Sequence, residues 1–306
     1  MPITFFKKLR DVLPHKDLKF LLHEHLHVRD PHRGVKTVHA SELTHDEREF
    51  CPRFYALADV TQAKLPDRWL STSENVTFAM GHWLQDQVVH WFAEMGRAVG
   101  HWVCVSCNQL HEFQLRPVKC KSCGSRVFKP EEVRFVSAKS GASCGVDMLI
   151  NTGKPLLVPV EIKTMDKDVF KALVAPLAEH RLRTTLYLRI IAESGHHWAN
   201  RVDTSMAYVL YVSKGGYGCA DPQLKTWGLY EHFSPFKSYE VPRNDKLAEP
   251  QSRRARVVKQ FREGKVGMPA GVCPTAMTKR AKICPLCKAC FAGDYPPVHH
   301  WQGGLG

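Results

Sequence analysis

Three charged residues lie inside a stretch whose apolar pattern is typical of a buried strand hairpin: Asp147, Glu161 and Lys163, in GVDMLINTGKPLLVPVEIKTM (145–165). Charged groups in a buried sheet are costly unless they pair with one another or hold a metal ion. If the turn is centred on Lys154, Asp147 lies directly opposite Glu161 and on the same face as Lys163. A shift of one residue would send Asp147 to the other face. The sequence therefore predicts two neighbouring carboxylates with an ammonium group beside them.

Such a group of side chains is suited to metal-assisted hydrolysis. A hard cation such as Mg²⁺ prefers oxygen ligands and keeps several waters. A metal-bound water beside an ammonium group can act as the nucleophile toward a phosphodiester. The alternative is an Asp–Lys or Glu–Lys ion pair on a solvated sheet face, but the succession of strand, turn, strand and long helix favours the catalytic interpretation. Pro159, inside the second strand, predicts a bulge or bend at that point.

A second constellation has the spacing C-x2-C-x12-C-x2-C and consists of Cys104, Cys107, Cys120 and Cys123. Each C-x2-C pair can hold one side of a tetrahedral zinc ion through its thiolates. Four protein ligands leave no open position, so we predict a structural zinc site rather than a catalytic one. Basic residues nearby are candidates for contacts with phosphate: Lys119, Lys121, Arg126 and Lys129.

A third group of cysteines lies near the C-terminus, in GVCPTAMTKRAKICPLCKACFAGD (271–294): Cys273, Cys284, Cys287 and Cys290. A further cysteine, Cys51, stands alone in FCPRFYAL (50–57). Four thiolates can bind zinc or an iron–sulfur cluster, and spacing alone does not decide between them. Cys144 and Cys219 have no cysteine close to them in the sequence, and we predict that they are ordinary small apolar residues.

The composition, 44% hydrophobic and 24% charged over 306 residues, is typical of a soluble globular protein that can bury a sizeable core. No apolar run approaches the roughly 18 residues of a membrane helix. The start, MPITFFKKLRDVLPHKD, lacks the apolar core and cleavage site of a secretory signal. We therefore expect a cytoplasmic protein with reduced thiols and no membrane partner, in which eleven cysteines indicate metal ligands rather than disulfides.

The net charge of +13 is concentrated in two segments. Residues 101–130 carry five Lys or Arg and one Glu, a net +4, and residues 243–290 carry twelve Lys or Arg and three acids, a net +9. Both segments coincide with cysteine groups. Clustered positive charge is typical of a protein that binds a polyanion, most simply nucleic acid, whereas the alternative is a solvated basic surface.

Hydrophobic periodicity predicts an α/β core with helices packed on a mixed sheet. Ser41 is the expected N-cap of a first helix over ELTHDEREF, and a second helix spans roughly 75–96 with one apolar stripe: Val76, Met80, Leu84, Val88 and Trp91. Strands are expected at 132–138, 144–150, 156–164 and 205–213. A long helix over 167–194 is interrupted at Pro176. Residues 214–242 are expected to be loop-rich, and a basic helix covers 243–264.

The chain resembles the PD-(D/E)xK nucleases, in particular the RecB-type branch with an iron–sulfur cluster, over roughly residues 39–292. The matching segments are SELTHDEREFCPRFYAL (41–57), GVDMLI…PVEIKT, HRLRTTLYL (180–188) and the cysteine-rich tail. The resemblance implies a PD-(D/E)xK nuclease core with a mixed central sheet, an inserted zinc ribbon and an iron–sulfur-stapled C-terminal segment. It divides the chain into an N-terminal extension (1–38), a nuclease domain (39–292) with its ribbon insert (101–130) and basic, Cys-rich segment (243–292), and a tail (293–306).

The resemblance also implies roles for individual residues. Asp147, Glu161 and the backbone carbonyl of Ile162 would bind Mg²⁺ or Mn²⁺, Lys163 would position or activate the attacking water, and Tyr187 would contact DNA or brace the site. A [4Fe–4S] cluster would be held by Cys51, Cys273, Cys284 and Cys290, with Cys287 as the rival of Cys273.

The chain departs from the family pattern at two places. The family usually has a metal-binding His four residues after a helix glycine, but Gln85 stands four residues after Gly81, and His82 is the candidate substitute. In the later helix Arg183 stands where the family has Gln, and an Arg grips phosphate more strongly than Gln does. The expected DNA-binding residues are Arg183, His180, Lys119, Lys121, Arg253, Arg254 and Arg256.

These observations predict a metal-dependent DNA exonuclease, of the kind encoded by phages, that works with replication or recombination proteins. The alternative from the same fold is a DNA-binding or scaffold protein with weak or no catalysis, which the residues at positions 85 and 183 would favour. A zinc-ribbon regulator with an accidental D…ExK pattern would explain neither Cys51 nor the C-terminal cysteines. The sequence leaves the polarity of digestion, the strand preference and the oligomeric state open.

Overall fold

The computed structural model describes residues 18–26, 29–30, 37–44, 50–62, 68–215, 218–227 and 233–292. The chain forms two compact units. The first comprises Met1–Arg33 and Leu65–Trp83, and the second comprises Gly34–Lys64 and Leu84–Gly306. The boundary between them falls inside helix α5 (Thr72–Glu94). No described helix has both the length and the apolarity needed to cross a bilayer.

The first unit is held together by a short ladder and two side-chain hydrogen bonds. Its elements are α2 (Leu18–Leu26), β1 (Arg29–Asp30), β3 (Arg68–Trp69) and the first part of α5, and β1 pairs with β3 antiparallel. Thr72 Oγ1 lies 2.9 Å from Nδ1 of His23, and Asn75 Nδ2 donates to the carbonyl of Leu26 at 2.9 Å. Ser71 and Glu74 form a reciprocal capping pair at the start of α5. These bonds fasten the end of α2 to the start of α5.

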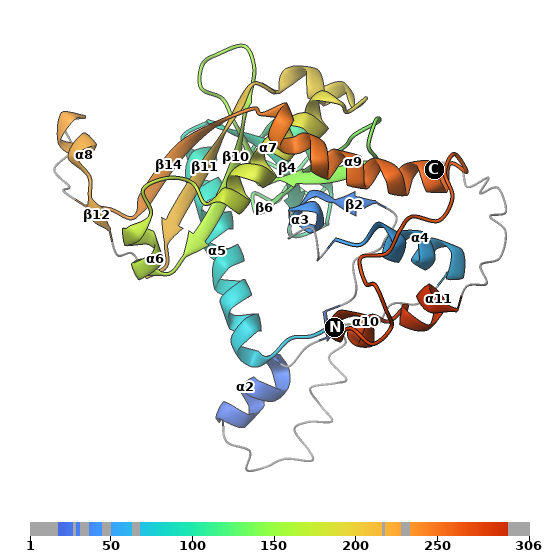
Figure 1. The fold of residues 1–306 in the computed structure, drawn as a ribbon. Coiled ribbons are helices and arrows are strands. Elements are labelled where there is room, and N and C mark those ends of the chain that lie inside the picture. Colours follow the sequence, from blue (N-terminus) through green and yellow to red (C-terminus); the bar gives the residue numbers. More distant parts are fainter. Residues whose placement is uncertain are drawn as a thin grey trace. The chain divides into compact units, whose positions relative to one another are not determined.

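The second unit is built on one mixed sheet with the strand order β14–β11–β10–β9–β4–β5, and β6 also pairs with β4 (Figure 1). Its strands are β4 (Ala98–Cys104), β5 (Leu110–Leu115), β6 (Phe128–Glu131), β9 (Met148–Ile150), β10 (Val158–Met165), β11 (Met206–Ser213) and β14 (Phe236–Pro242). Strands β10 and β11 run parallel, whereas every other neighbouring pair is antiparallel. The prediction of a mixed sheet is confirmed. The strands of the ribbon, β4 to β6, continue this sheet through the β4–β9 ladder.

A smaller sheet of three strands lies next to it in the chain: β2 (Val38–His39), β7 (Val133–Val136) and β8 (Ala142–Val146), in the order β2–β8–β7. The chain leaves this sheet after Val146 and enters the large sheet at Met148. The expected single strand over 144–150 is therefore wrong. It is broken at Asp147, which is a bend between two sheets.

Helices cover both faces of the large sheet. The second half of α5 packs on one face, in a cluster that includes Val88, Val89, Phe92, Met148, Val160 and Ile162. Helix α7 (Ala178–Ala192) packs on the other face, in a cluster that includes Leu149, Leu157, Leu186 and Ile190. Side chains alternate along a strand, so Met148 and Leu149 point to opposite faces. Residues 147, 161 and 163 therefore share the α7 face.

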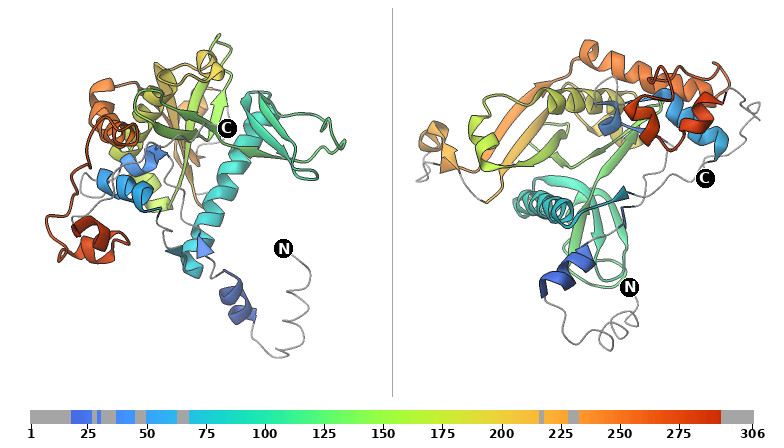
Figure 2. Two further views of the ribbon diagram at one scale, coloured as in Figure 1. Left: turned by 90° about the vertical axis from the view of Figure 1, so that its right-hand side faces the viewer. Right: turned by 60° about the horizontal axis from the view of Figure 1, so that its bottom comes forward.

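The remaining elements surround α7 and the strand ends: α3 (Ala40–Leu43), α4 (Pro52–Thr61), α6 (Lys167–Ala172), η1 (His197–Arg201), β12 (Cys219–Ala220), α8 (Pro222–Thr226), β13 (Phe233–Ser234), α9 (Asp245–Arg262), α10 (Lys279–Ile283) and α11 (Cys287–Phe291). Helix α9 lies beside α7 and α4, and the C-terminal helices α10 and α11 lie beside α4 (Figures 1 and 2). Segments more than two hundred residues apart thus meet at α4.

Several expected elements are confirmed and others need correction. The interruption at Pro176 separates α6 from α7, and the basic helix is α9. The expected cap Ser41 is wrong, because His39 caps α3 and its N–H is held by the Glu42 carboxylate at 2.9 Å. That helix ends at Leu43, and residues 45–49 of its expected span lie outside the described residues.

Three further predictions differ from the structure. The expected stripe on α5 is buried only where the helix packs on the sheet, since Val76, Met80 and Trp91 are exposed. The loop-rich segment 214–242 contains strand β14. The bulge at Pro159 is absent, because β9 and β10 pair in one register from residue 158 to 160. Pro159 precedes the first residue of β10 that pairs with β11, so its missing N–H interrupts no bond to that neighbour.

Candidate active site and metal centres

The register of the hairpin brings the two predicted carboxylates together. Strand β9 pairs with β10 so that Met148 lies opposite Val160. Continued by one residue, this register places Asp147 opposite Glu161, as predicted from a turn centred on Lys154. The Oδ2 atom of Asp147 accepts a hydrogen bond from the backbone N–H of Ile162 at 2.7 Å. This bond fixes the Asp147 carboxylate against β10.

Glu161 is the most buried acid of this group, with 3% of its surface exposed. Its Oε1 atom lies 2.5 Å from Nζ of Lys163 and 3.8 Å from Nη1 of Arg183. Its Oε2 atom is buried and has no hydrogen-bond partner among the residues that the structure describes. A buried carboxylate oxygen without a partner is costly, so this position favours an additional cation or donor.

Burial and like charge shape the protonation of the site. Burial, followed by the neighbouring Glu161 charge, raises the pKa of Asp147 well above its usual value. Burial alone would lower the pKa of Lys163, but the charges of Glu161 and Asp147 outweigh it and raise that pKa. Lys163 is therefore a firm ammonium group, and it shares the Glu161 carboxylate with the guanidinium group of Arg183.

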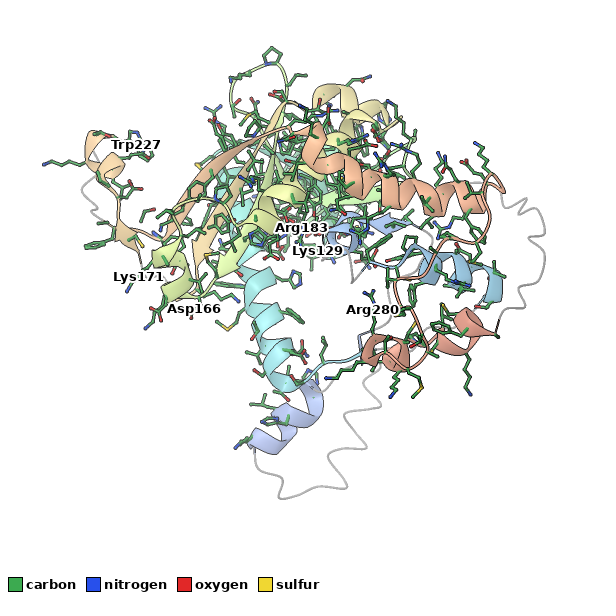
Figure 3. The ribbon with its side chains drawn as sticks, viewed as in Figure 1. Lys129, Asp166, Lys171, Arg183, Trp227 and Arg280 are labelled. Atoms are coloured by element: carbon green, nitrogen blue, oxygen red, sulfur yellow. The ribbon has the colours of Figure 1, made fainter. Side chains whose placement is uncertain are left out.

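Helix α7 forms a wall over these groups. His180, Arg183 and Tyr187 are spaced by three and four residues, so they lie on one face of the helix. Arg183 lies where this face meets β10 (Figure 3). Tyr187 is 6% exposed, and burial together with the charges of Glu161 and Asp147 raises its pKa. The structure therefore brings Arg183 and Tyr187 to the predicted triad.

His180 is held by a residue that the sequence did not single out, Tyr211 on β11. Their Nδ1 and hydroxyl oxygen lie 2.9 Å apart, and the same hydroxyl accepts from the backbone N–H of Leu177 at 3.0 Å. The Tyr211 proton is thus directed to Nδ1. Burial, with the nearby charges of Lys163 and Arg183, lowers the pKa of His180 to about 4, so this ring is neutral at physiological pH. The sequence held no signal for Tyr211, because its place beside Lys163 depends on the pairing of β10 with β11.

The two candidates on α5, Gln85 and His82, have different surroundings from those of Arg183 and Tyr187. Gln85 belongs to the half of α5 that packs on the face of Ile162, opposite to that of Glu161 and Lys163. His82 belongs to the first unit and is exposed. Their roles stay predictions. Glu132, which the sequence analysis did not consider, is one of the groups whose charge raises the pKa of Asp147, after burial and Glu161.

The four ribbon cysteines come together in space. The ligand atoms of Cys104, Cys107, Cys120 and Cys123 all lie within 4.8 Å of one another, an arrangement that could hold a metal ion. Two similar loops present them. In each loop the first cysteine accepts, through its carbonyl, from a residue with positive φ four positions on: Asn108 (φ 58°) in one and Gly124 (φ 77°) in the other. Burial opposes ionisation of Cys104, but the N–H groups of Cys107 and Ser106 lower its pKa to about 6.

The other predicted cysteine group lines a cavity of about 320 Å³ between α4, α10 and α11. Five thiols face it: Cys51, Cys273, Cys284, Cys287 and Cys290. Burial raises the pKa of Cys290, Arg53 opposes this, and the charges of Cys51, Cys284 and Cys273 raise it further. Arg280 of α10 also lines the cavity (Figure 3). A Cβ atom at Gly271 would lie 3.2 Å from Cδ of Arg53 and 3.8 Å from Sγ of Cys290, so a larger residue here would press on the Arg53 side chain.

The predicted DNA-binding residues differ in their surroundings. Lys119 and Lys121 are exposed on the ribbon. On α9, Arg253 and Arg256 each lie within 4.0 Å of the Glu249 carboxylate. Arg254 donates to Gln251 Oε1 at 2.6 Å and packs over the ring of Phe50. The excess positive charge of α9 is thus partly balanced by the chain itself.

No protein-family model matches the chain, and no curated protein matches it either. Among solved structures, that of SSO0001 aligns with a TM-score of 0.34 and 14% identity, over 83% of this chain and 87% of its own. An alkaline exonuclease (LHK-Exo) from Laribacter hongkongensis aligns with a TM-score of 0.41 and 10% identity, over 74% of this chain and 87% of its own. The complex of LHK-Exo with dAMP aligns with a TM-score of 0.39 and 11% identity over the same shares. At these scores the likeness is distant.

Proposed function

We propose that this chain is a divalent-metal-dependent nuclease that hydrolyses phosphodiester bonds in DNA. The observation that carries the proposal is the register of β9 and β10, which sets Asp147 opposite Glu161 and beside Lys163. The buried Oε2 atom of Glu161, without a partner among the described residues, is suited to a cation. Within this proposal the nuclease domain spans residues 39–292.

The donor set fits a hard cation. Asp147, Glu161 and the carbonyl of Ile162 would hold Mg²⁺ or Mn²⁺, because such ions prefer oxygen ligands. The bound ion would supply charge stabilisation and a more acidic water. The N–H of Ile162 orients the Asp147 carboxylate. Lys163, whose pKa is raised by its two carboxylate neighbours, keeps its protons and therefore orients a water as a donor rather than removing a proton from it.

The wall formed by α7 would contact the DNA. Arg183 presents a guanidinium group that suits a phosphate oxygen. His180 is neutral, with its Nδ1 engaged by Tyr211, so Nε2 carries the remaining proton and can donate to a phosphate. The positive charge of the ribbon and the C-terminal segment would add a non-specific attraction for DNA.

We propose that the enzyme is a phage-type exonuclease that acts with replication or recombination proteins.

The two cysteine groups suit two different metal centres. The four ribbon thiols are close enough to surround one zinc ion. The cavity at α4 is lined by thiols that are not gathered so closely, and its volume of about 320 Å³ leaves room for a larger group. We propose a [4Fe–4S] cluster there, held by Cys51, Cys273, Cys284 and Cys290, with Cys287 as the rival of Cys273.

A second candidate is a DNA-binding protein of the same fold with little or no catalysis. The observation that favours it is Arg183, whose guanidinium lies 3.8 Å from Glu161 and competes with a metal ion for the same carboxylate. The two candidates differ in whether Lys163 matters for cleavage.

The test is cleavage of labelled single- and double-stranded DNA with Mg²⁺ or Mn²⁺ by the wild type, Lys163→Ala and the control Lys171→Ala. Lys171 is an exposed lysine on α6, labelled in Figure 3. We expect Lys163→Ala to lose about 10²-fold or more of the rate, as for a group that acts on the reacting atoms, and Lys171→Ala to retain it. Equal cleavage by all three proteins would contradict the catalytic role, and DNA binding without cleavage by the wild type would favour the second candidate.

A further inference from the structure

The chain passes between its two sheets at two places: at Glu132, between β6 and β7, and at Asp147, between β8 and β9. Strands β7 and β8 pair with Val133 opposite Val146. Continued by one residue, this register puts Glu132 opposite Asp147. The other register puts Glu161 opposite Asp147 as well. Asp147 therefore has a glutamate on each of its two neighbouring segments, Glu132 before β7 and Glu161 on β10.

The side chain of Glu132 occupies space that a glycine leaves free. A Cβ atom added at Gly145 would lie 2.2 Å from Oε2 and 2.9 Å from Cδ of Glu132, and the third nearest atom also belongs to Glu132. Gly145 and Asp147 are two residues apart and share a strand face. The glycine is thus needed for space at this point, and it lets the Glu132 carboxylate lie on the face that carries Asp147.

The described cations leave one carboxylate oxygen of this junction without a partner. Lys163 and Arg183 both approach Oε1 of Glu161, and Oε2 of this 97%-buried glutamate has no partner among the described residues. The one cation that the described structure pairs with Glu132 is Arg134, whose nitrogen lies 3.8 Å away and whose side chain is 74% exposed. Such a surface pair contributes little. The buried, unpaired oxygen of Glu161 favours an additional cation, and the charge of Glu132 acts on the neighbouring Asp147.

We propose that Glu132 supplies a third carboxylate ligand to the divalent cation of the active site, beside Asp147 and Glu161. This inference rests on the proposed function. Glu132 comes from a strand break rather than from helix α5, where the family resemblance places a ligand and where this chain has the neutral Gln85. An additional anionic oxygen strengthens the binding of a hard cation.

The experiment is a Mn²⁺ titration of the full-length protein, followed by the electron paramagnetic resonance signal of free Mn²⁺. Thiolate sites select softer metals, so Mn²⁺ reports on the carboxylates. Glu132→Gln should weaken Mn²⁺ binding by at least about tenfold, the lower range for changes at metal sites. The control Glu131→Gln removes the same charge from the neighbouring exposed residue, on the other strand face, and should leave the affinity unchanged.

A second pair of variants tests the space above Gly145. Gly145→Ala should displace the Glu132 carboxylate and weaken Mn²⁺ binding to a similar extent, whereas Gly195→Ala, where a Cβ meets nothing within 4 Å, should not. The double variant Glu132→Gln/Gly145→Ala should be no weaker than Glu132→Gln alone, because both changes remove the same ligand. Fully additive losses would overturn the inference.

The metal-free protein separates a ligand from a structural residue. Without Mn²⁺, Glu132→Gln should melt at or above the temperature of the wild type, since it relieves repulsion at the junction, but its gain in melting temperature on adding Mn²⁺ should be smaller. Wild-type affinity in Glu132→Gln, together with lost binding in Asp147→Asn, would overturn this inference alone. A wild type that binds no Mn²⁺ would overturn the proposed function too.

Discussion

The two cysteine groups of this molecule differ in how closely their sulfur atoms lie and in how far apart their residues are in the sequence. In the ribbon, four sulfur atoms lie within 4.8 Å of one another, and two loops of nearly the same design present them from segments only 19 residues apart. In the C-terminal group, five thiols face a cavity of about 320 Å³, and one of them, Cys51, comes from the other end of the chain. The ribbon thiols are close enough to bind one metal ion, whereas the C-terminal thiols line a cavity that has room for a larger group.

This difference separates what local chain geometry can do from what tertiary packing must do. The ribbon loops are fixed by their own backbone hydrogen bonds and by residues with positive φ, so local geometry sets the spacing of each pair of thiols. The cavity exists only when α10 and α11 lie against α4. A metal centre in the ribbon would thus hold a local structure, whereas one in the cavity would connect the two ends of the second unit.

Among the variants that separate the two cysteine groups, Cys51→Ser should have the largest effect on metal content. If the proposed cluster is present, loss of this thiol should reduce the iron content from about four atoms per chain to near zero, and the segment 263–292 should become sensitive to proteolysis. Iron analysis, visible absorbance of protein purified without oxygen and limited proteolysis would measure this. Cys219→Ser is the matched control, because Cys219 lies away from both groups. A colourless wild type with two zinc ions and no iron would break the comparison.

A smaller, local effect is expected for Cys104→Ser. Cys104 is fully buried in the ribbon, and its loss should lower the zinc content from about one ion per chain to near zero. The iron content should not change, and new protease sites should be confined to residues 105–127. Loss of both metals in this variant would show that the two groups are not independent.

The difference between Cys273→Ser and Cys287→Ser tests which four of the five cavity thiols are ligands. The charge of Cys273 acts on both Cys284 and Cys290, whereas that of Cys287 acts on Cys284. We therefore expect Cys273→Ser to lose the cluster and Cys287→Ser to keep most of it. The ratio of absorbance near the cluster band to protein absorbance would measure both variants, and the reverse order would exchange the two assignments.

The smallest effect extends the comparison to the carboxylates. The pKa of Asp147 is raised by burial and by Glu161, so the folded protein holds this proton at pH values where the unfolded chain has lost it. The stability of the metal-free wild type should therefore fall as pH rises through this pKa. Asp147→Asn removes that penalty and should melt higher at pH 8, by about 2–4 °C for each kcal/mol of repulsion relieved, with no gain below pH 4. An equal gain at both pH values would argue against a titrating carboxylate.

The sequence predicted those parts of the site that depend on contacts between residues close to one another in the chain. Asp147 and Glu161 are equidistant from the turn at Lys154, and alternation along a strand then fixes their common face. The ribbon cysteines follow from spacing alone. The α7 residues Arg183 and Tyr187 were expected only from the family resemblance of HRLRTTLYL (180–188).

Other features depend on long-range pairing and had no local signal. Strand β14 is a mostly exposed edge strand with one buried residue, Val241, so its apolar alternation is weak. The split at Asp147 arises because β8 and β9 find different partners. Glu132 could not be predicted from the sequence either, because its place opposite Asp147 depends on the β7–β8 register.

The strand break at Asp147 also has a consequence for the order of events during synthesis. One half of the broken strand needs the small sheet and the other half needs the large one, and β10 receives its parallel neighbour only after β11 has emerged. A nascent chain with only the large sheet formed has Asp147 opposite Glu161 but lacks the β7–β8 register that brings Glu132 to Asp147. The complete acidic group would therefore form only after both sheets have formed.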